Sequence, residues 1–194
     1  MSSPARDELD AELMRTLAEG DDLALNRLMD AWSQPLISYL MRLTGSHATA
    51  CDLSQESFVR VHRHRFEYRV SQKFATWLFA IATNLARNHA RWRCRHPEAL
   101  TEPENLRELQ VASTHASPDE QAAANERFAA VQKAVSELPH DMREVLILST
   151  WHGLNHAEIA RVQSTTEKAV EVRLYRARKL LRELLGDMLK MGEV

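Results

Sequence analysis

Apolar residues recur at helical spacing along most of the chain, and most regularly near its C-terminal end. There they fall at steps of four, three, four, three and four residues, which keeps one apolar stripe on a single helix: Val170, Leu174, Ala177, Leu181, Leu184 and Met188. Thr166 is the expected N-cap of this helix, and Glu167 suits its first turn. A short helix around 157–160 and a turn at 162–165 precede it. The pattern predicts a helix-turn-helix.

Basic side chains of this last helix fall outside the apolar stripe, where they can face phosphate: Arg173, Arg176, Lys179 and Arg182. A helix that enters a major groove needs such cations on its flanks and an anchored apolar back. An ordinary helical hairpin with a solvated basic face would have the same pattern. The segment by itself favours DNA binding and leaves that alternative open.

The rest of the chain is also predicted to be helical. Five glycines and six prolines leave few chain breakers among 194 residues, so we expect an all-α fold. Residues 96–118 hold three prolines and many polar side chains, which indicates a flexible acidic linker between two small helical domains at 1–95 and 119–194. A short helix around 103–110 is left open. Helices are expected near 7–19, 22–44, 47–66, 73–95, 119–137 and 139–152.

The formal net charge of -2 hides two basic segments. Residues 1–59 carry four basic against ten acidic residues, and residues 96–126 carry one against seven. Residues 60–95 carry nine basic residues against one acidic residue. Residues 127–194 carry eleven against nine, with the basic excess concentrated at 161–182. Because nucleic-acid binding depends on local patches, the chain offers two candidate surfaces separated by an acidic segment.

The helix expected at 73–95 would have an apolar face and a polar face. The inward positions are Trp77, Leu78, Ile81, Ala82 and Leu85, and the outward ones are Asn84, Arg87, Asn88, Arg91 and Arg95. Asparagine can both donate to and accept from base edges, while arginine binds phosphate. This polar face is therefore a candidate DNA surface.

The segment just before this helix interleaves aromatic and basic side chains. Phe66, Tyr68 and Phe74 alternate with Arg69 and Lys73, a composition that suits stacking against unpaired bases. It is equally compatible with Phe66 and Phe74 as core anchors beside solvated charges. The four tryptophans, at 32, 77, 92 and 151, are expected to be core or interdomain anchors, although Trp77 and Trp92 also lie near this face.

Four motifs together resemble the extracytoplasmic-function (ECF) sigma factors of the sigma-70 family. They are Asp52-Leu-Ser-Gln-Glu-Ser-Phe-Val-Arg-Val61, Phe74-Ala-Thr-Trp-Leu-Phe-Ala-Ile-Ala-Thr-Asn-Leu-Ala-Arg87, Leu138-Pro with Arg143-Glu-Val-Leu, and Glu158-Ile-Ala with Arg173-Leu-Tyr-Arg-Ala-Arg178. The resemblance implies a sigma factor that directs bacterial RNA polymerase core to specific promoters and assists promoter opening. Residues 1–95 would be region 2, which docks on core and recognises the minus-10 element. Residues 119–194 would be region 4, which recognises the minus-35 element.

The resemblance also implies a role for individual residues. Those expected to bind the polymerase core, through its β′ subunit, are Asp52, Leu53, Gln55, Glu56, Phe58 and Val61. Those expected at minus-10 DNA are Tyr68, Arg69, Lys73, Trp77, Asn84, Arg87, Asn88 and Arg91. Those expected at minus-35 DNA are Thr166, Lys168, Ala169, Glu171, Arg173, Arg176 and Arg178. The implied partners are the β′ and β subunits of polymerase, promoter DNA and an anti-sigma factor.

Two features depart from the family pattern. Ser164 stands where members often have glycine, between Gln163 and Thr165 where they have apolar residues, which puts the geometry of the turn in question. Glu171 stands where many members carry lysine. It could accept from a cytosine amino group, or form a surface salt bridge with Lys168 or Arg173. The linker has two interpretations as well, a tether or an acidic segment that threads into the polymerase.

Other function classes find little support. Nine histidines and two cysteines lack the spacing of a structural zinc site, so we expect no metal, no other cofactor and no catalytic residues. Cys94 lies between Arg93 and Arg95 and could sense oxidants, although an unreactive exposed thiol is the simpler interpretation. No signal peptide or membrane insertion is expected, and the predicted location is cytoplasmic. The alternative function is a stand-alone helix-turn-helix transcription regulator.

Overall fold

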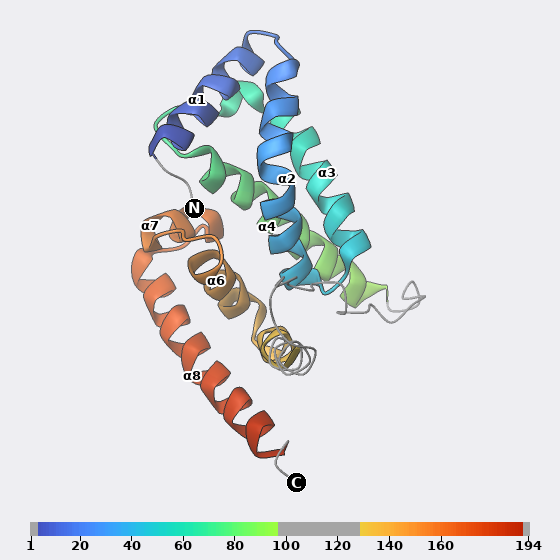
Figure 1. The fold of residues 1–194 in the computed structure, drawn as a ribbon, viewed down its shortest axis with the longest axis vertical. Coiled ribbons are helices and arrows are strands. Elements are labelled where there is room, and N and C mark those ends of the chain that lie inside the picture. Colours follow the sequence, from blue (N-terminus) through green and yellow to red (C-terminus); the bar gives the residue numbers. More distant parts are fainter. Residues whose placement is uncertain (1–3, 97–128, 192–194) are drawn as a thin grey trace, which may run out of the picture.

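The computed structural model describes residues 4–96 and 129–191, with side chains through residue 186. All regular structure within these ranges is helical, which confirms the all-α prediction (Figure 1). The helices are α1 (Pro4–Ala18), α2 (Leu23–Thr44), α3 (His47–Arg63), α4 (Phe74–Arg95), α6 (His140–Thr150), α7 (His156–Gln163) and α8 (Glu167–Met191), with a 3-10 turn η1 (Arg65–Glu67) and a helical segment at 129–137. The predicted linker beyond His96 and the helix around 103–110 lie outside the described residues.

α2 is the central helix of the N-terminal half, α1–α4, because it packs against α1, α3 and α4 (Figure 1). It ends where Gly45 adopts a left-handed conformation (φ 79°) and donates its N–H to Met41 O. Ser46 then caps α3 by accepting a hydrogen bond from Thr49 N. This short turn sets α2 and α3 side by side.

A buried polar pair ties α1 to α2. The Trp32 indole donates to Asp10 Oδ2 at 2.9 Å, and Arg6 Nε donates to Asp10 Oδ1 at 3.0 Å. Burial raises the pKa of the Asp10 carboxyl, although the charge of Arg6 opposes that shift. Trp32 is therefore a core anchor, as its sequence position predicts.

The C-terminal half, α6–α8, is built on the predicted apolar stripe. Val170, Leu174 and Ala177 are buried, and α8 packs along α6 through them and their neighbours. α7 begins with a capping box, in which Asn155 and Glu158 each bond the other's backbone N–H at 2.9 Å. The order of α7, turn and α8 is consistent with the helix-turn-helix prediction (Figure 1).

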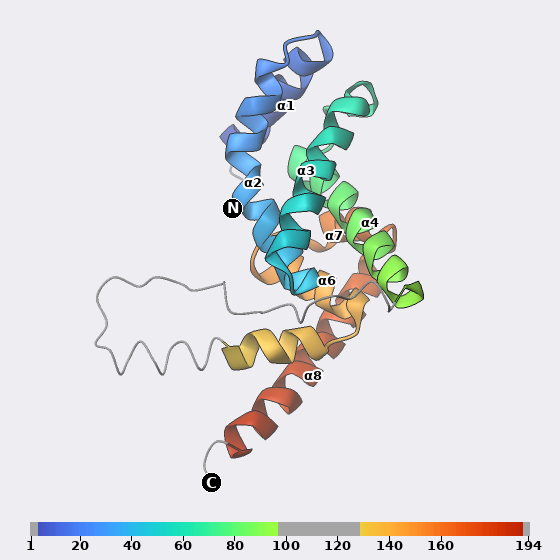
Figure 2. The ribbon, with the colours of Figure 1, turned by 90° about the vertical axis from the view of Figure 1, so that its right-hand side faces the viewer.

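The two halves pack against each other instead of lying apart. α6 lies against α2 and α7 lies against α4, as the two views agree (Figures 1 and 2). The turn between α6 and α7 inserts His152 next to two rings of the N-terminal core, Tyr39 at 5.6 Å and Phe79 at 4.8 Å between centroids. Beside it, the Arg42 guanidinium lies over the Trp151 ring at 5.2 Å. Trp151 is thus an interdomain anchor, as expected.

Three predicted boundaries need correction. The helix expected at 47–66 ends at Arg63, after which the chain forms η1, and the one expected at 139–152 ends at Thr150. The turn expected at 162–165 begins only at Ser164, because Val162 and Gln163 belong to α7 and are buried. In each case the spacing of apolar residues does not mark the residue at which the helical backbone hydrogen bonds end.

His152 should make the packing of the two halves sensitive to acid. Burial, with the nearby charge of Arg42, lowers the pKa of His152 from 6.5 to about 4, and its Nε2 has no hydrogen-bond partner. A folded-state pKa below the unfolded one gives stability that is present above pH 6.5 and lost as the pH falls toward 4. Between pH 7 and pH 5 this group should cost up to about 2 kcal/mol of unfolding free energy.

The measurement is urea denaturation of the full chain at a series of pH values. His152→Leu should lose this share of the acid sensitivity, whereas His156→Gln, at an exposed position, should follow the wild-type curve. Parallel curves for wild type and His152→Leu would contradict a buried neutral imidazole.

Candidate nucleic-acid interface

The outward face of α4 is only partly open to solvent. Asn84, Asn88, Arg91 and Arg95 are exposed, and Arg91 Nη1 lies 3.4 Å from Asn88 Oδ1. Arg87, in the middle of the same face, points into the C-terminal half instead. The residues predicted to bind minus-10 DNA on α4 therefore share one helix face, but Arg87, its central cation, is already paired with Glu144.

The aromatic segment before α4 divides into buried and exposed rings. Phe74 is 1% exposed, so it is a core anchor, whereas Phe66 is 70% exposed and lies under the Arg65 guanidinium at 4.4 Å. The core-anchor interpretation is right for Phe74 and wrong for Phe66. Tyr68 is half-buried against Trp77, with its hydroxyl donating to Gln72 O at 2.8 Å. Of the aromatic and basic side chains in this segment, Phe66, Arg69 and Lys73 are exposed.

Lys73 bridges the two halves at the start of α4. Its Nζ lies 3.1 Å from a carboxylate oxygen of Asp7 on α1 and 3.1 Å from one of Glu158 on α7. Hydrogen bonds from Lys73 to Glu158 and to Asp7 raise the pKa of Lys73. A second predicted minus-10 residue is thus held by carboxylates.

The most buried ionic group of this interface is the carboxylate of Glu144 on α6. It accepts from Arg87 Nε at 2.8 Å and Arg87 Nη2 at 2.5 Å, from His140 Nδ1 at 2.9 Å and from Gln163 Nε2 at 2.6 Å. We call Glu144 with Arg87, His140 and Gln163 the Glu144 network. It joins α4 to α6 and α7.

The protonation of Glu144 reflects this environment. Burial alone would raise the pKa of Glu144, but hydrogen bonds from His140 and Arg87 outweigh it and hold the pKa below its usual value. The same carboxylate and, above all, burial raise the pKa of Tyr39, whose hydroxyl lies 2.7 Å from Thr83 Oγ1. Glu144 is therefore a carboxylate, not a neutral acid, inside the interface.

The predicted minus-35 residues lie mostly on the exposed face of α8. Thr166 Oγ1 caps the helix by accepting from Ala169 N at 3.2 Å, as predicted. Lys168, Glu171, Arg176 and Arg178 are exposed, and Ala169 is half-buried. Glu171 pairs with Lys168 at 2.7 Å, one of the two salt bridges left open by the sequence, and this pairing lowers the pKa of Glu171.

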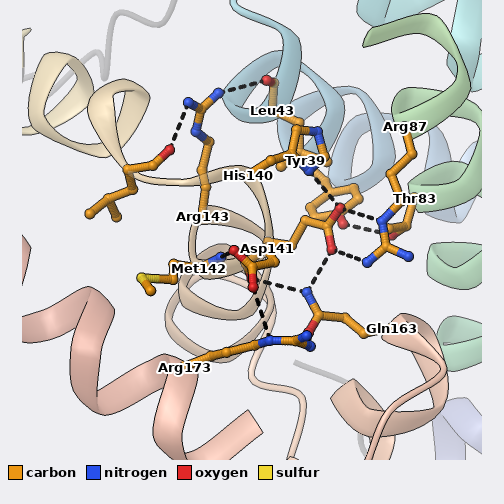
Figure 3. A network of polar contacts seen from close by, with 12 residues as sticks. Tyr39, Leu43, Thr83, Arg87, His140, Asp141, Met142, Arg143, Gln163 and Arg173 are labelled. Carbon is orange, nitrogen blue, oxygen red and sulfur yellow. Dashed lines mark hydrogen bonds and ion pairs between the residues drawn. The ribbon is translucent and has the colours of Figure 1, made fainter. Parts of the chain in front are cut away.

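Arg173 is placed differently from the other basic residues of α8. It lies 3.1 Å from Asp141 on α6 and donates to Gln163 Oε1 at 2.7 Å (Figure 3). It thus points to the back of the helix-turn-helix and not to the exposed face. Val172 and Tyr175, which the sequence analysis did not select, are exposed on that face at 38% and 67%. An apolar side chain on an otherwise polar helix face is the sequence pattern that could have identified these two residues.

The polar turn of the helix-turn-helix has a structural explanation. Ser164 adopts a left-handed conformation with φ 53° and ψ 51°, which glycine would adopt without strain. Gln163, where an apolar residue is usual, is buried but uses its amide to donate to Asp141 O at 3.0 Å and to Glu144. The departure from the family pattern therefore leaves the turn intact.

The motif predicted to dock on polymerase contains both surface and core residues. Asp52 and Gln55 are exposed, Leu53 and Glu56 are half-buried, and Phe58 and Val61 are buried in the core, where they position α3. Beside the motif, a groove of about 630 Å³ opens between α3 and the α1–α2 turn. Leu23 and Val59 are large exposed apolar residues at this groove, and the sequence analysis missed both.

No group of three or more metal-ligating side chains occurs among residues 4–96 and 129–191. In the same part of the chain, none of the helices has the length and apolar character required to cross a membrane. Cys94 is exposed at the C-terminal end of α4.

Comparison with known proteins places these features in a family. The family model described as Sigma-70 region 2 matches residues 28–95, and the one described as Sigma-70, region 4 matches residues 128–181. The chain is 30% identical to the RNA polymerase sigma-H factor of Pseudomonas aeruginosa over 187 residues, which cover 94% of this chain and 97% of that protein. The chain belongs to the sigma-70 family of RNA polymerase sigma factors.

Two further similarities refine the position of this sigma factor. It is 33% identical to the ECF RNA polymerase sigma factor BldN of Streptomyces coelicolor, over 95% of this chain and 70% of that protein. Its fold resembles that of the sigma factor RpoE in complex with the anti-sigma factor NepR from Bartonella quintana, with a TM-score of 0.63, 22% identity and coverage of 83% and 96%. The sigma factor is thus of the ECF type, and it acts in promoter-specific transcription initiation and not as an enzyme.

Substitution of Ser164 tests the geometry of the turn. Ser164→Gly should raise the unfolding free energy by about 1 kcal/mol, because glycine adopts the left-handed conformation without steric cost to a Cβ atom. Ser164→Ala keeps the Cβ atom and is the matched control, expected to give no gain. Both are measured by urea denaturation, and an equal response of the two variants would refute a left-handed Ser164.

Proposed function

We propose that this sigma factor holds its promoter at two points, one on each half of the chain. The exposed face of α8 binds the minus-35 element as duplex through Lys168, Glu171, Arg176 and Arg178. The polar face of α4, with the segment that precedes it, binds the minus-10 element and holds unpaired bases. The observation that carries the proposal is the presence of two separate cationic helix faces in a sigma-70 family chain.

The division of labour follows from the chemistry of each surface. α8 is a long helix with a polar N-terminal end and basic flanks, which suits insertion into a major groove. The segment before α4 offers an exposed aromatic ring, Phe66, stacked with Arg65, and aromatic and guanidinium faces stack on unpaired bases. Melting a few base pairs costs several kcal/mol, which such stacking and phosphate contacts would offset.

The partner that brings both surfaces to a promoter is RNA polymerase core. Asp52, Gln55 and Glu56 give α3 an acidic and polar outer face, and the adjoining groove supplies apolar surface at Leu23 and Val59. A mixed face of this kind suits docking on a pair of partner helices, here those of the β′ subunit. Phe58 and Val61 contribute by supporting this face from the core.

An anti-sigma factor is a further proposed partner. The resembling RpoE structure holds a sigma factor together with its anti-sigma factor NepR. A sigma factor that competes for core must be inhibited when it is not needed. An anti-sigma factor that binds this chain would supply that inhibition.

Reconstituted transcription tests the proposed function. The purified chain added to sigma-free core polymerase should start transcripts at discrete positions on genomic DNA of a bacterium that encodes it, and core alone should not. Sequence-specific duplex binding without core, and no initiation with it, would instead favour a stand-alone helix-turn-helix regulator.

Single substitutions test the division between the two surfaces. Arg178→Ala on α8 should weaken duplex retention by holoenzyme and lower the slope of log affinity against log salt by about 1. Asn84→Ala on α4 should reduce promoter opening with less effect on duplex retention. Arg27→Ala, an exposed cation on α2, is the matched control. Gel retention and permanganate footprinting separate the two steps, and equal loss of both steps in both variants would contradict the division.

A further inference from the structure

A pocket of about 450 Å³ lies where the turn between α6 and α7 meets the N-terminal half. Its walls come from one face of α2, from the first two turns of α4 and from that turn. It shares no residue with the proposed DNA and polymerase surfaces. Pockets of this size hold small molecules in many proteins, so its chemistry is worth following residue by residue.

The inner part of the pocket is apolar and aromatic. Phe79, Trp32 and Leu154 line it and are all buried. Trp151 and Gln34 also line it and are exposed, so they lie on its outer side. The Trp32 and Phe79 rings meet edge to face, with 6.3 Å between their centroids. Such walls favour a flat aromatic ligand group, because ring contacts add to the gain from apolar burial.

Arg42 is the cation of this pocket, and part of its guanidinium is unused. Its Nη1 donates to both oxygens of Ser38, at 2.9 Å to the backbone one, and its other nitrogens make no hydrogen bond to the described residues. One of these nitrogens, Nε, is buried. The edge formed by Nε and Nη2 is the one that binds a carboxylate through two parallel N–H bonds.

The charge of Arg42 is also uncompensated. Burial lowers the pKa of Arg42, and no acidic residue in the described part of the chain opposes this shift. Arg87 is the opposite case, because its hydrogen bonds to Glu144 raise its pKa. A partly buried cation without a counter-charge is destabilising, and an anion bound beside it would remove that cost.

His152 supplies a second polar group to the same pocket. Its Nε2 is buried and has no hydrogen-bond partner within residues 4–96 and 129–186. Burial and then the charge of Arg42 lower the pKa of His152, so the two side chains lie close enough to act on one ligand group. A neutral imidazole donates from one ring nitrogen. Buried polar groups are nearly always bonded, so two unbonded ones in one pocket point to a polar ligand.

The charge of the pocket selects a monoanion. Among the residues that line it only Arg42 is charged, since His152 is neutral. One carboxylate balances this cation. A phosphate monoester carries a second negative charge near neutral pH, and that charge would lack a partner here.

We propose that this pocket binds a small aromatic carboxylic acid, with its carboxylate on Arg42 and His152 and its ring against Phe79 and Trp151. Such a ligand touches both halves, because Arg42 and Phe79 belong to α2 and α4 whereas Trp151 and His152 belong to the turn between α6 and α7. The site is separate from the DNA and polymerase surfaces, so it stands or falls independently of the roles proposed for them.

Isothermal titration calorimetry of the full chain near neutral pH tests the ligand class. The probe is naphthoate, and naphthamide is its uncharged analogue. Naphthoate should bind at one site per chain, and naphthamide about tenfold more weakly, because hydrogen bonds to a charged group are the stronger ones. Naphthyl phosphate, with its additional negative charge, should also bind more weakly than naphthoate.

Substitutions test the place of binding. Arg42→Gln should weaken naphthoate binding about tenfold and abolish the preference for naphthoate over naphthamide. Arg27→Gln removes an exposed cation of the same helix and is the matched control, expected to keep the wild-type affinity. Trp151→Ala removes an exposed wall of the pocket and should weaken both probes about fivefold.

Circular dichroism establishes that each variant is folded, and Trp151→Ala decides the matter if Arg42→Gln is not. Absence of binding up to the solubility limit of naphthoate would overturn the proposal. Equal affinities for naphthoate and naphthamide, wild-type affinity in the folded pocket variants, or an equal loss in Arg27→Gln would do the same. Tighter binding of naphthyl phosphate would overturn the assignment to a carboxylate.

Discussion

One buried carboxylate determines how the two halves of this sigma factor meet. An ionised carboxylate away from water is destabilising by several kcal/mol unless its oxygens are satisfied. Glu144 meets this requirement with one guanidinium from α4 and two donors from its own half. Only Arg87 comes from the other half, so this side chain of α4 links the Glu144 carboxylate to the N-terminal half, and the Lys73–Glu158 and Arg143–Leu43 O contacts join the halves beside it. The rest of the interface is compatible with that geometry.

The apolar part of the interface responds to different solution conditions from the Glu144 network. His152 fills a space between Tyr39 and Phe79, and Arg42 lies over Trp151. The His152 contacts require a neutral imidazole, whereas the Glu144 network requires an ionised carboxylate. Acid weakens the first, whereas salt screens the more exposed ion pairs of the interface, such as Lys73 with Glu158. The packing of the two halves is therefore held by two groups of contacts that respond to different conditions.

Much of the local structure could be predicted from the sequence. The stripe from Val170 to Ala177 predicts which face of α8 is buried, and Thr166 predicts where that helix begins. Boundaries were less predictable at Arg63 and Gln163, because apolar spacing does not reveal where a helix changes to a turn. The Glu144 network was missed, since a glutamate four residues after His140 in an apolar segment carries no sign of its partner fifty-seven residues away.

The sequence by itself determined the family, the helical class and the two basic helix faces, because these depend on residue identity and short-range periodicity. Only the tertiary structure decided which cations of those faces are available. Arg87 and Arg173 have the same chemistry as Arg91 and Arg178, but the first two are paired with acidic residues of α6 and the last two are exposed. That difference arises from contacts between distant segments, since a charge is free or engaged according to what folding places beside it.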